Sequence, residues 1–127
     1  MIINNENLDS IIFLYSGGRD SMLSIKRLID YKFKDIQILT CQNQHIEDIT
    51  WARDSANKLC HKYNPKISVL PPINSGPIMY DMMSVFANRR NIDCEMSQII
   101  CLCCRASMIV CAVALAKRSS IHTIGIV

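Results

Sequence analysis

Glycine, proline and tryptophan are scarce in this 127-residue chain, which has four, four and one of them respectively. The two common glycine motifs that bind phosphate, G-x-x-x-x-G-K-S/T and G-x-G-x-x-G, are both missing. There is no internal repeat, low-complexity tract or linker, so we expect one domain over residues 1–127. A net charge of +3 is too small to indicate nucleic-acid binding by itself.

Long apolar runs are missing too. The longest nearly apolar stretch, residues 106–116, is far shorter than the roughly 20 residues that cross a bilayer. The first fifteen residues have no basic flank and do not resemble a secretory signal. We therefore expect a cytoplasmic protein with no membrane partner. Its seven cysteines would be reduced there, which favours metal binding or sulfur chemistry over disulfides.

Short apolar runs alternate with helical patterns along the chain. Strands are predicted at residues 11–15, 36–40, 67–70 and 121–127, and helices at 21–31, 46–63, 78–90 and 105–117. This alternation predicts an α/β fold in which helices cover both faces of a parallel sheet. Because the chain stops on a strand with no closing helix, we expect it to be truncated at its C-terminus.

The loop after the first predicted strand is the most informative segment. It reads Ser16-Gly17-Gly18-Arg19-Asp20-Ser21. A loop between a buried strand and a helix N-terminus is where such sheets bind anions. Its glycines allow positive φ and close approach of the backbone, Ser16 and Ser21 add hydroxyls, and Arg19 adds a cation. The alternative is a tight turn in which Asp20 or Ser21 caps the helix.

Strand, loop and helix together resemble the SGGxDS signature of the PP-loop ATP pyrophosphatases, an adenine nucleotide α-hydrolase-like (HUP) superfamily. The resemblance implies a Rossmann-like sheet with the strand order 3-2-1-4. It also implies that residues 16–21 bind ATP, that a nucleophile attacks the α-phosphorus, and that pyrophosphate leaves an adenylated intermediate. Arg19, where many members carry lysine, and Asp20 would be catalytic, and Asp20 would help to hold Mg²⁺.

A cysteine cluster precedes the last predicted helix, with a C-x-x-C pair formed by Cys101 and Cys104 and with Cys103 between them. At the mouth of a helix, such a pair favours metal ligation or lowered thiol pKa values. The alternative is that these cysteines are small buried apolar residues.

The run CLCCRASMIVCAVALAKRSSIHTIGI, residues 101–126, resembles a segment of the tRNA-thiolating PP-loop enzymes. That resemblance implies that Cys101 and Cys104 bind a 4Fe–4S cluster, or zinc, with Cys103 or Cys94 as a third ligand. It also implies a catalytic role for Cys104 and a nucleotide contact at Gly125. The expected partners are ATP, tRNA and a sulfur donor, and a homodimer is left open.

The expected function is therefore ATP-dependent adenylation of a substrate, in tRNA thiolation or a related sulfur transfer. Two alternatives stay open. One is a protein resembling the sulfonucleotide reductases, which share the loop but reduce a sulfonucleotide. The other is a truncated, non-catalytic module that binds a nucleotide or a metal.

Overall fold

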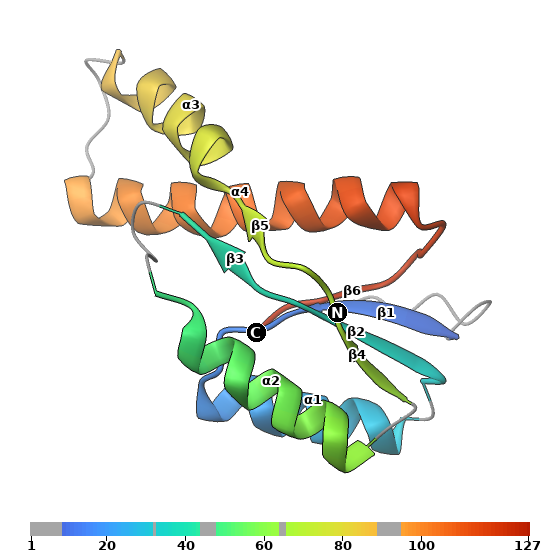
Figure 1. Cartoon of the computed structure of the whole chain (residues 1–127). Coiled ribbons are helices and arrows are strands. Elements are labelled where there is room, and N and C mark those ends of the chain that lie inside the picture. The colour runs from blue at the N-terminus through green and yellow to red at the C-terminus, as the bar shows by residue number, and fades with distance from the viewer. Residues whose placement is uncertain (1–8, 32, 44–47, 64–65, 89–94) are drawn as a thin grey trace.

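A four-stranded parallel sheet lies at the centre of the structure, a computed structural model that describes residues 9–31, 33–43, 48–63, 66–88 and 95–127 (Figure 1). The strand order is β4-β2-β1-β6. The strands are β1 (Ser10–Leu14), β2 (Asp35–Leu39), β4 (Ile67–Val69) and β6 (Ile124–Gly125). This is the order 3-2-1-4 that the sequence predicted, counting its four predicted strands along the chain.

Strand β1 is buried on both faces, as its continuous apolar run predicted. Successive side chains of a strand point to opposite faces. Ile11 and Phe13 therefore lie in one core cluster, and Ile12 lies in another on the opposite side of the sheet. The residues of β1 pair in parallel register with those of β2, from Ser10 with Asp35 to Leu14 with Leu39.

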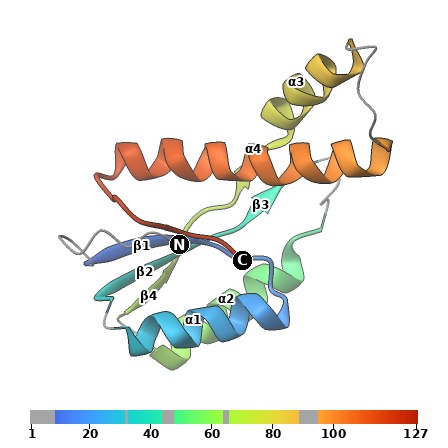
Figure 2. The same cartoon turned by 180° about the vertical axis from the view of Figure 1, so that it is seen from behind.

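Helices cover both faces of this sheet (Figures 1 and 2). Helices α1 (Arg19–Asp30) and α2 (Thr50–Tyr63) lie on one face, where Ile25 and Leu59 join the cluster around Ile11. Helix α4 (Met96–Arg118) lies on the other face, where Ala112 packs in the cluster around Ile12. The predicted α/β class, with a parallel sheet between helices, is confirmed.

A second, two-stranded parallel sheet is formed by β3 (Cys41–Gln42) and β5 (Ile73–Asn74). Strand β3 begins two residues after β2 ends, and β5 leads into helix α3 (Gly76–Ala87), which packs against α4. At that contact Met79, Cys103 and Cys104 form a third core cluster. The methionines of α3 are therefore packing residues.

Helix α4 corrects the sequence prediction, because it begins at Met96 and not at Arg105. Glu95 is its N-cap and forms a reciprocal capping box with Gln98, whose side-chain oxygen accepts a hydrogen bond from the Glu95 N–H at 3.3 Å. The predicted last strand is also too long, since β6 covers only Ile124–Gly125. Two other predicted helices extend too far: α2 begins at Thr50 where the prediction began at 46, and α3 ends at Ala87 where the prediction ended at 90.

The corrected length of α4 bears on the membrane question. With 23 residues and an apolar composition, this helix is long enough to cross a bilayer, which the 106–116 stretch alone was not. A core helix of a soluble protein meets the same criteria. In this structure α4 packs against α3, β1 and β6.

Candidate functional site

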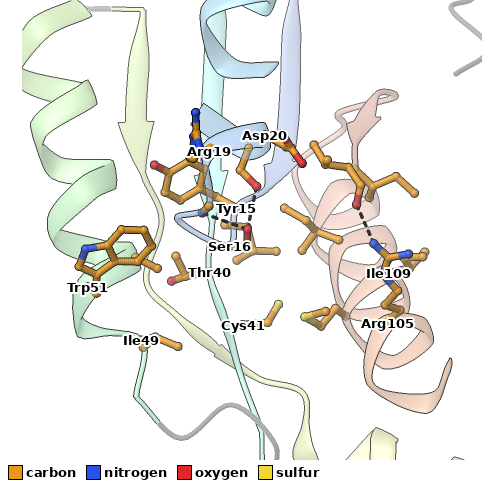
Figure 3. Close-up of a pocket in the computed structure, with 18 of the residues that line it drawn as sticks. Tyr15, Ser16, Arg19, Asp20, Thr40, Cys41, Ile49, Trp51, Arg105 and Ile109 are labelled. Carbon is orange, nitrogen blue, oxygen red and sulfur yellow. Dashed lines mark hydrogen bonds between the residues drawn. The ribbon is translucent and has the colours of Figure 1, made fainter. Parts of the chain in front are cut away.

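A pocket of about 540 Å³ opens at the carboxyl ends of β1 and β2 (Figure 3). Ligand sites commonly have about 300–1,000 Å³. The wall is built from the loop after β1, the residues that follow β2, the start of α2, the middle of α4 and the last residues of the chain. In open parallel sheets, ligands bind at this edge.

The loop of residues 16–21 forms one wall of the pocket. Helix α1 begins inside this loop at Arg19. Its N-cap is Gly18, so no side-chain hydrogen bond caps the helix. The N–H groups of a first helical turn have no partner within the helix, and the positive end of the helix dipole lies there. Asp20 and Ser21 lie within the first turn, so neither is the N-cap that the tight-turn alternative required.

The two loop glycines have different roles. Gly17 has φ +80°, and a Cβ there would lie 2.8 Å from Cζ3 of Trp51 and 2.9 Å from Cα of Ala52. Gly18 has φ −71°, and its nearest contact for a Cβ would be Ser16 Oγ at 3.4 Å. Gly17 is therefore required by the fold and does not line the pocket. Gly18 does line the pocket and leaves open space there.

The two loop serines hold each other. Ser16 Oγ and Ser21 Oγ lie 2.8 Å apart in a hydrogen bond, and the Gly18 N–H donates to Ser16 Oγ at 3.3 Å. Ser21 is buried and Ser16 is exposed. The pair fixes the loop's shape and places both hydroxyl groups in the pocket wall.

Arginines line the pocket from two directions. Arg19 comes from the first turn of α1, as the sequence predicted, and Arg105 comes from α4. Both are exposed. Arg105 Nη2 donates a hydrogen bond to the main-chain oxygen of Val127 at 3.1 Å (Figure 3). Sequence reasoning placed Arg105 beside the cysteines and missed the pocket, because it placed the helix start at this residue.

Two carboxylates line the same pocket. Asp20, a predicted site residue, is exposed in the first turn of α1. Asp48 Oδ1 accepts a hydrogen bond from the Thr50 N–H at 2.9 Å, and this bond holds the pKa of Asp48 below its ordinary value. Asp48 thus holds the first residue of α2, and the sequence did not predict its place in the pocket wall.

The cysteine cluster lies within α4, so the predicted placement at a helix N-terminus is wrong. Cys101 is exposed, whereas Cys103 and Cys104 are buried against α3. Asn43 Nδ2 donates a hydrogen bond to Cys104 Sγ at 3.2 Å. Within the described ranges, no group of three or more histidine, cysteine or acidic side chains could hold a metal ion. A 4Fe–4S cluster or a zinc ion therefore does not fit these three cysteines; Cys94 lies outside the described residues.

Two further residues differ from expectation. Gly125 is buried in β6, where a side chain would collide with the Phe13 ring, and it does not line the pocket; Ile126 and Val127 do. Cys104 does not line the pocket either, but Cys41 does. Burial raises the pKa of the Cys41 thiol to about 12, so it is protonated at neutral pH.

No protein-family model, curated protein or solved structure matches this chain. The pocket's own residues therefore carry the functional argument. The pocket combines an uncapped helix N-terminus, arginines on two sides and apolar side chains such as Ile49 and Trp51. Such a chamber suits a ligand with a concentrated negative charge at one end and a flat apolar body at the other.

Proposed function

We propose that this protein binds ATP and activates a substrate by adenylation with release of pyrophosphate, as a PP-loop ATP pyrophosphatase does. One observation carries the proposal. The SGGRDS loop lies at the carboxyl end of β1, and the uncapped N-terminus of α1 within it forms a wall of the pocket. Sequence signature and three-dimensional placement thus point to the same anion site.

The phosphate end of ATP is assigned to this loop. The first-turn N–H groups of α1 supply donors, the missing side chain of Gly18 lets phosphate oxygens come close, and Arg19 adds a positive charge. Arg105 adds a second charge from α4. Its hydrogen bond to the Val127 oxygen is solvent-exposed, so it can be exchanged for a phosphate oxygen at little cost.

The base end is assigned to the apolar side of the pocket. Ile49 and Trp51 lie on that side at the start of α2, with Thr40 beside them at the end of β2 (Figure 3). Apolar and aromatic walls fit a purine ring and do not favour phosphate.

The proposed reaction transfers the AMP part of ATP. A nucleophilic atom of the acceptor bonds to the α-phosphorus, the bond from that phosphorus to the bridging oxygen breaks, and pyrophosphate departs with the bonding pair. The acceptor's proton passes to solvent. The loop N–H groups and arginines stabilise the charge that develops on the departing pyrophosphate. Mg²⁺, held by Asp20, would share that charge.

As acceptor we propose a tRNA base that later receives sulfur from a donor protein or small molecule. The support is the resemblance of residues 101–126 to the thiolating enzymes. Because the described cysteines do not fit a metal cluster, no step passes through one. The sulfur would then come from the donor protein or small molecule.

Calorimetry with ATP and Mg²⁺ tests the binding step. Asp20→Ala and Gly18→Val should each weaken binding by about 1–3 kcal/mol, because a charged contact or the close approach of the phosphate is lost. Asp30→Ala is the matched control, since Asp30 is an exposed carboxylate at the far end of the same helix. Equal affinity in the wild type and both loop variants would refute the assignment.

The products test the reaction class. With tRNA as acceptor, ATP should yield AMP and pyrophosphate in amounts that depend on Asp20. Formation of ADP and phosphate would place the protein in a different class of ATP-using enzymes.

A further inference from the structure

Thr40 stands out in the wall of the pocket. It directly follows β2 and only 1% of its surface is exposed. Its Oγ1 has no hydrogen-bond partner. Among the residues that the structure describes, it is the one buried side-chain nitrogen or oxygen that lacks a partner. Its main chain is held, because its carbonyl accepts a hydrogen bond from the Ile73 N–H at 3.1 Å.

A buried hydroxyl without a partner lowers stability, because it gives up its hydrogen bonds to water and gains none. Valine has nearly the same shape and would remove that cost. A polar group kept in this position therefore points to a partner that arrives from outside the chain.

The surroundings of Thr40 indicate what kind of group arrives. Its hydroxyl points toward the side of the pocket where Ile49 and Trp51 lie (Figure 3). The hydroxyl of Tyr15, which also lines the pocket, is already engaged with Ser55 Oγ at 2.6 Å. Arg105 lines the pocket from α4, on its other side. The Thr40 hydroxyl lies beside the apolar side chains of Ile49 and Trp51, and such a mixture suits the polar edge of a flat ring better than it suits a phosphate.

We propose that Thr40 hydrogen-bonds the base of the bound nucleotide and so contributes to its recognition. A hydroxyl can donate to a ring nitrogen and accept from an amino group, and a purine with an amino group beside a ring nitrogen presents both. Because the oxygen is covered, the side chains over it have to shift before a base can reach it. This inference rests on the proposed function, because it assumes that a nucleotide occupies the pocket.

The test compares Thr40→Val, which removes the hydroxyl and keeps the shape, with Thr40→Ser, which keeps the hydroxyl. Calorimetry is run with ATP, with ribose 5-triphosphate, which lacks the base, and with tripolyphosphate. Thr40→Val should weaken ATP binding about three- to tenfold and leave the two other ligands within about twofold. Thr40→Ser should bind ATP within about twofold of the wild type.

Stability gives an independent readout. Thr40→Val without ligand should unfold at a urea concentration equal to or higher than that of the wild type, because an unsatisfied polar group has been removed. A lower midpoint would show that the hydroxyl has a structural partner and would overturn the proposal. So would unchanged ATP binding, or an equal loss for ATP and ribose 5-triphosphate, which would move the contact to the sugar.

The two proposals fail in different ways. If wild-type protein binds neither ATP nor tripolyphosphate, the proposed function falls, and the role of Thr40 falls with it. If wild-type binding depends on Gly18 and Asp20 but not on the Thr40 hydroxyl, only the present inference falls.

Discussion

The indole ring of Trp51 lies against Gly17, so close that a methyl group on Gly17 would stand 2.8 Å from the ring carbon Cζ3. This contact joins the start of α2 to the loop after β1, two segments that are far apart in the sequence. It sets the shape of the pocket, because Trp51 and the loop residues on either side of Gly17 all line it.

The first prediction follows from this contact. Gly17→Ala should lower the free energy of unfolding by about 1–3 kcal/mol, because alanine is strained at φ +80° and its methyl group meets Trp51 and Ala52. Gly18→Ala is the matched control and should change it by no more than about 0.5 kcal/mol, since Gly18 has an ordinary φ and open space. Urea unfolding measures both, and equal losses would contradict the different roles assigned to the two glycines.

Trp51 also provides an optical signal, because it is the only tryptophan in the chain and 65% of its surface is exposed. A nucleotide base placed against the indole would displace water from it. We expect ATP to shift the emission to shorter wavelength and change its intensity, and we expect tripolyphosphate to have a smaller effect. Unchanged emission at an ATP concentration that saturates binding in calorimetry would place the base elsewhere.

Arg105 should contribute to ATP binding although it lies on α4, far from the loop in sequence. Arg105→Met keeps an unbranched apolar stem and removes the charge, so binding should weaken by about 1–3 kcal/mol. Arg118→Met, at the exposed end of the same helix, should have no measurable effect. If calorimetry finds the two variants alike, Arg105 does not contact the ligand.

The cysteines of α4 should differ in reactivity. Cys101 is exposed, while Cys103 is 1% and Cys104 is 6% exposed. Brief treatment of native protein with iodoacetamide, followed by peptide mass spectrometry, should label Cys101 well before the other two. If all three cysteines resist iodoacetamide until a chelator is added, they hold a metal ion, which would contradict the packing described for α4.

Cys41 makes stability depend on alkaline pH. Its thiol has an ordinary pKa of 9.0, and burial raises the pKa to about 12 in the folded protein. Between these values the unfolded chain has released a proton that the folded protein retains, so stability falls as pH rises, by about 1.4 kcal/mol per pH unit at most. Below pH 9 the thiol is protonated in both the folded and the unfolded protein, so Cys41 adds no pH dependence to stability there.

Urea unfolding of the wild type and of Cys41→Ala from pH 8 to about pH 10.5 isolates this effect. Other groups titrate in the same range in both proteins, so the difference between the two curves belongs to Cys41. That difference should shrink as pH rises above 9. A constant difference would mean that Cys41 is not held as a buried thiol.

The sequence predicted the sheet order and the loop well because their signals are local. Residues 11–31 carry a buried strand, a glycine turn and an amphipathic helix in one continuous stretch. Parallel strands with helical connections then leave few possible arrangements. The loop residues Ser16, Gly18, Arg19, Asp20 and Ser21 all line the pocket.

The errors have physical causes as well. The residues before Arg105 were interpreted as a cysteine-rich segment and not as part of α4. The helix begins earlier, where Glu95 and Gln98 form a capping box. Gly125 was predicted to contact the nucleotide, but it is glycine because the Phe13 ring leaves no room for a side chain. A sequence alone does not distinguish these two reasons for a glycine. Thr40, Asp48 and Arg105 were missed as pocket residues, because only folding brings them beside the loop.

Nitrogen-15 NMR of the wild-type protein, titrated with ATP and Mg²⁺, tests the central claim most directly. The account predicts that the largest shifts fall on the backbone amides of residues 18–21 and on the indole N–H of Trp51. The amides of α3, which do not line the pocket, should stay in place. Shifts centred on α3 or on the far ends of the strands, or none at millimolar ATP, would contradict an ATP site at this loop.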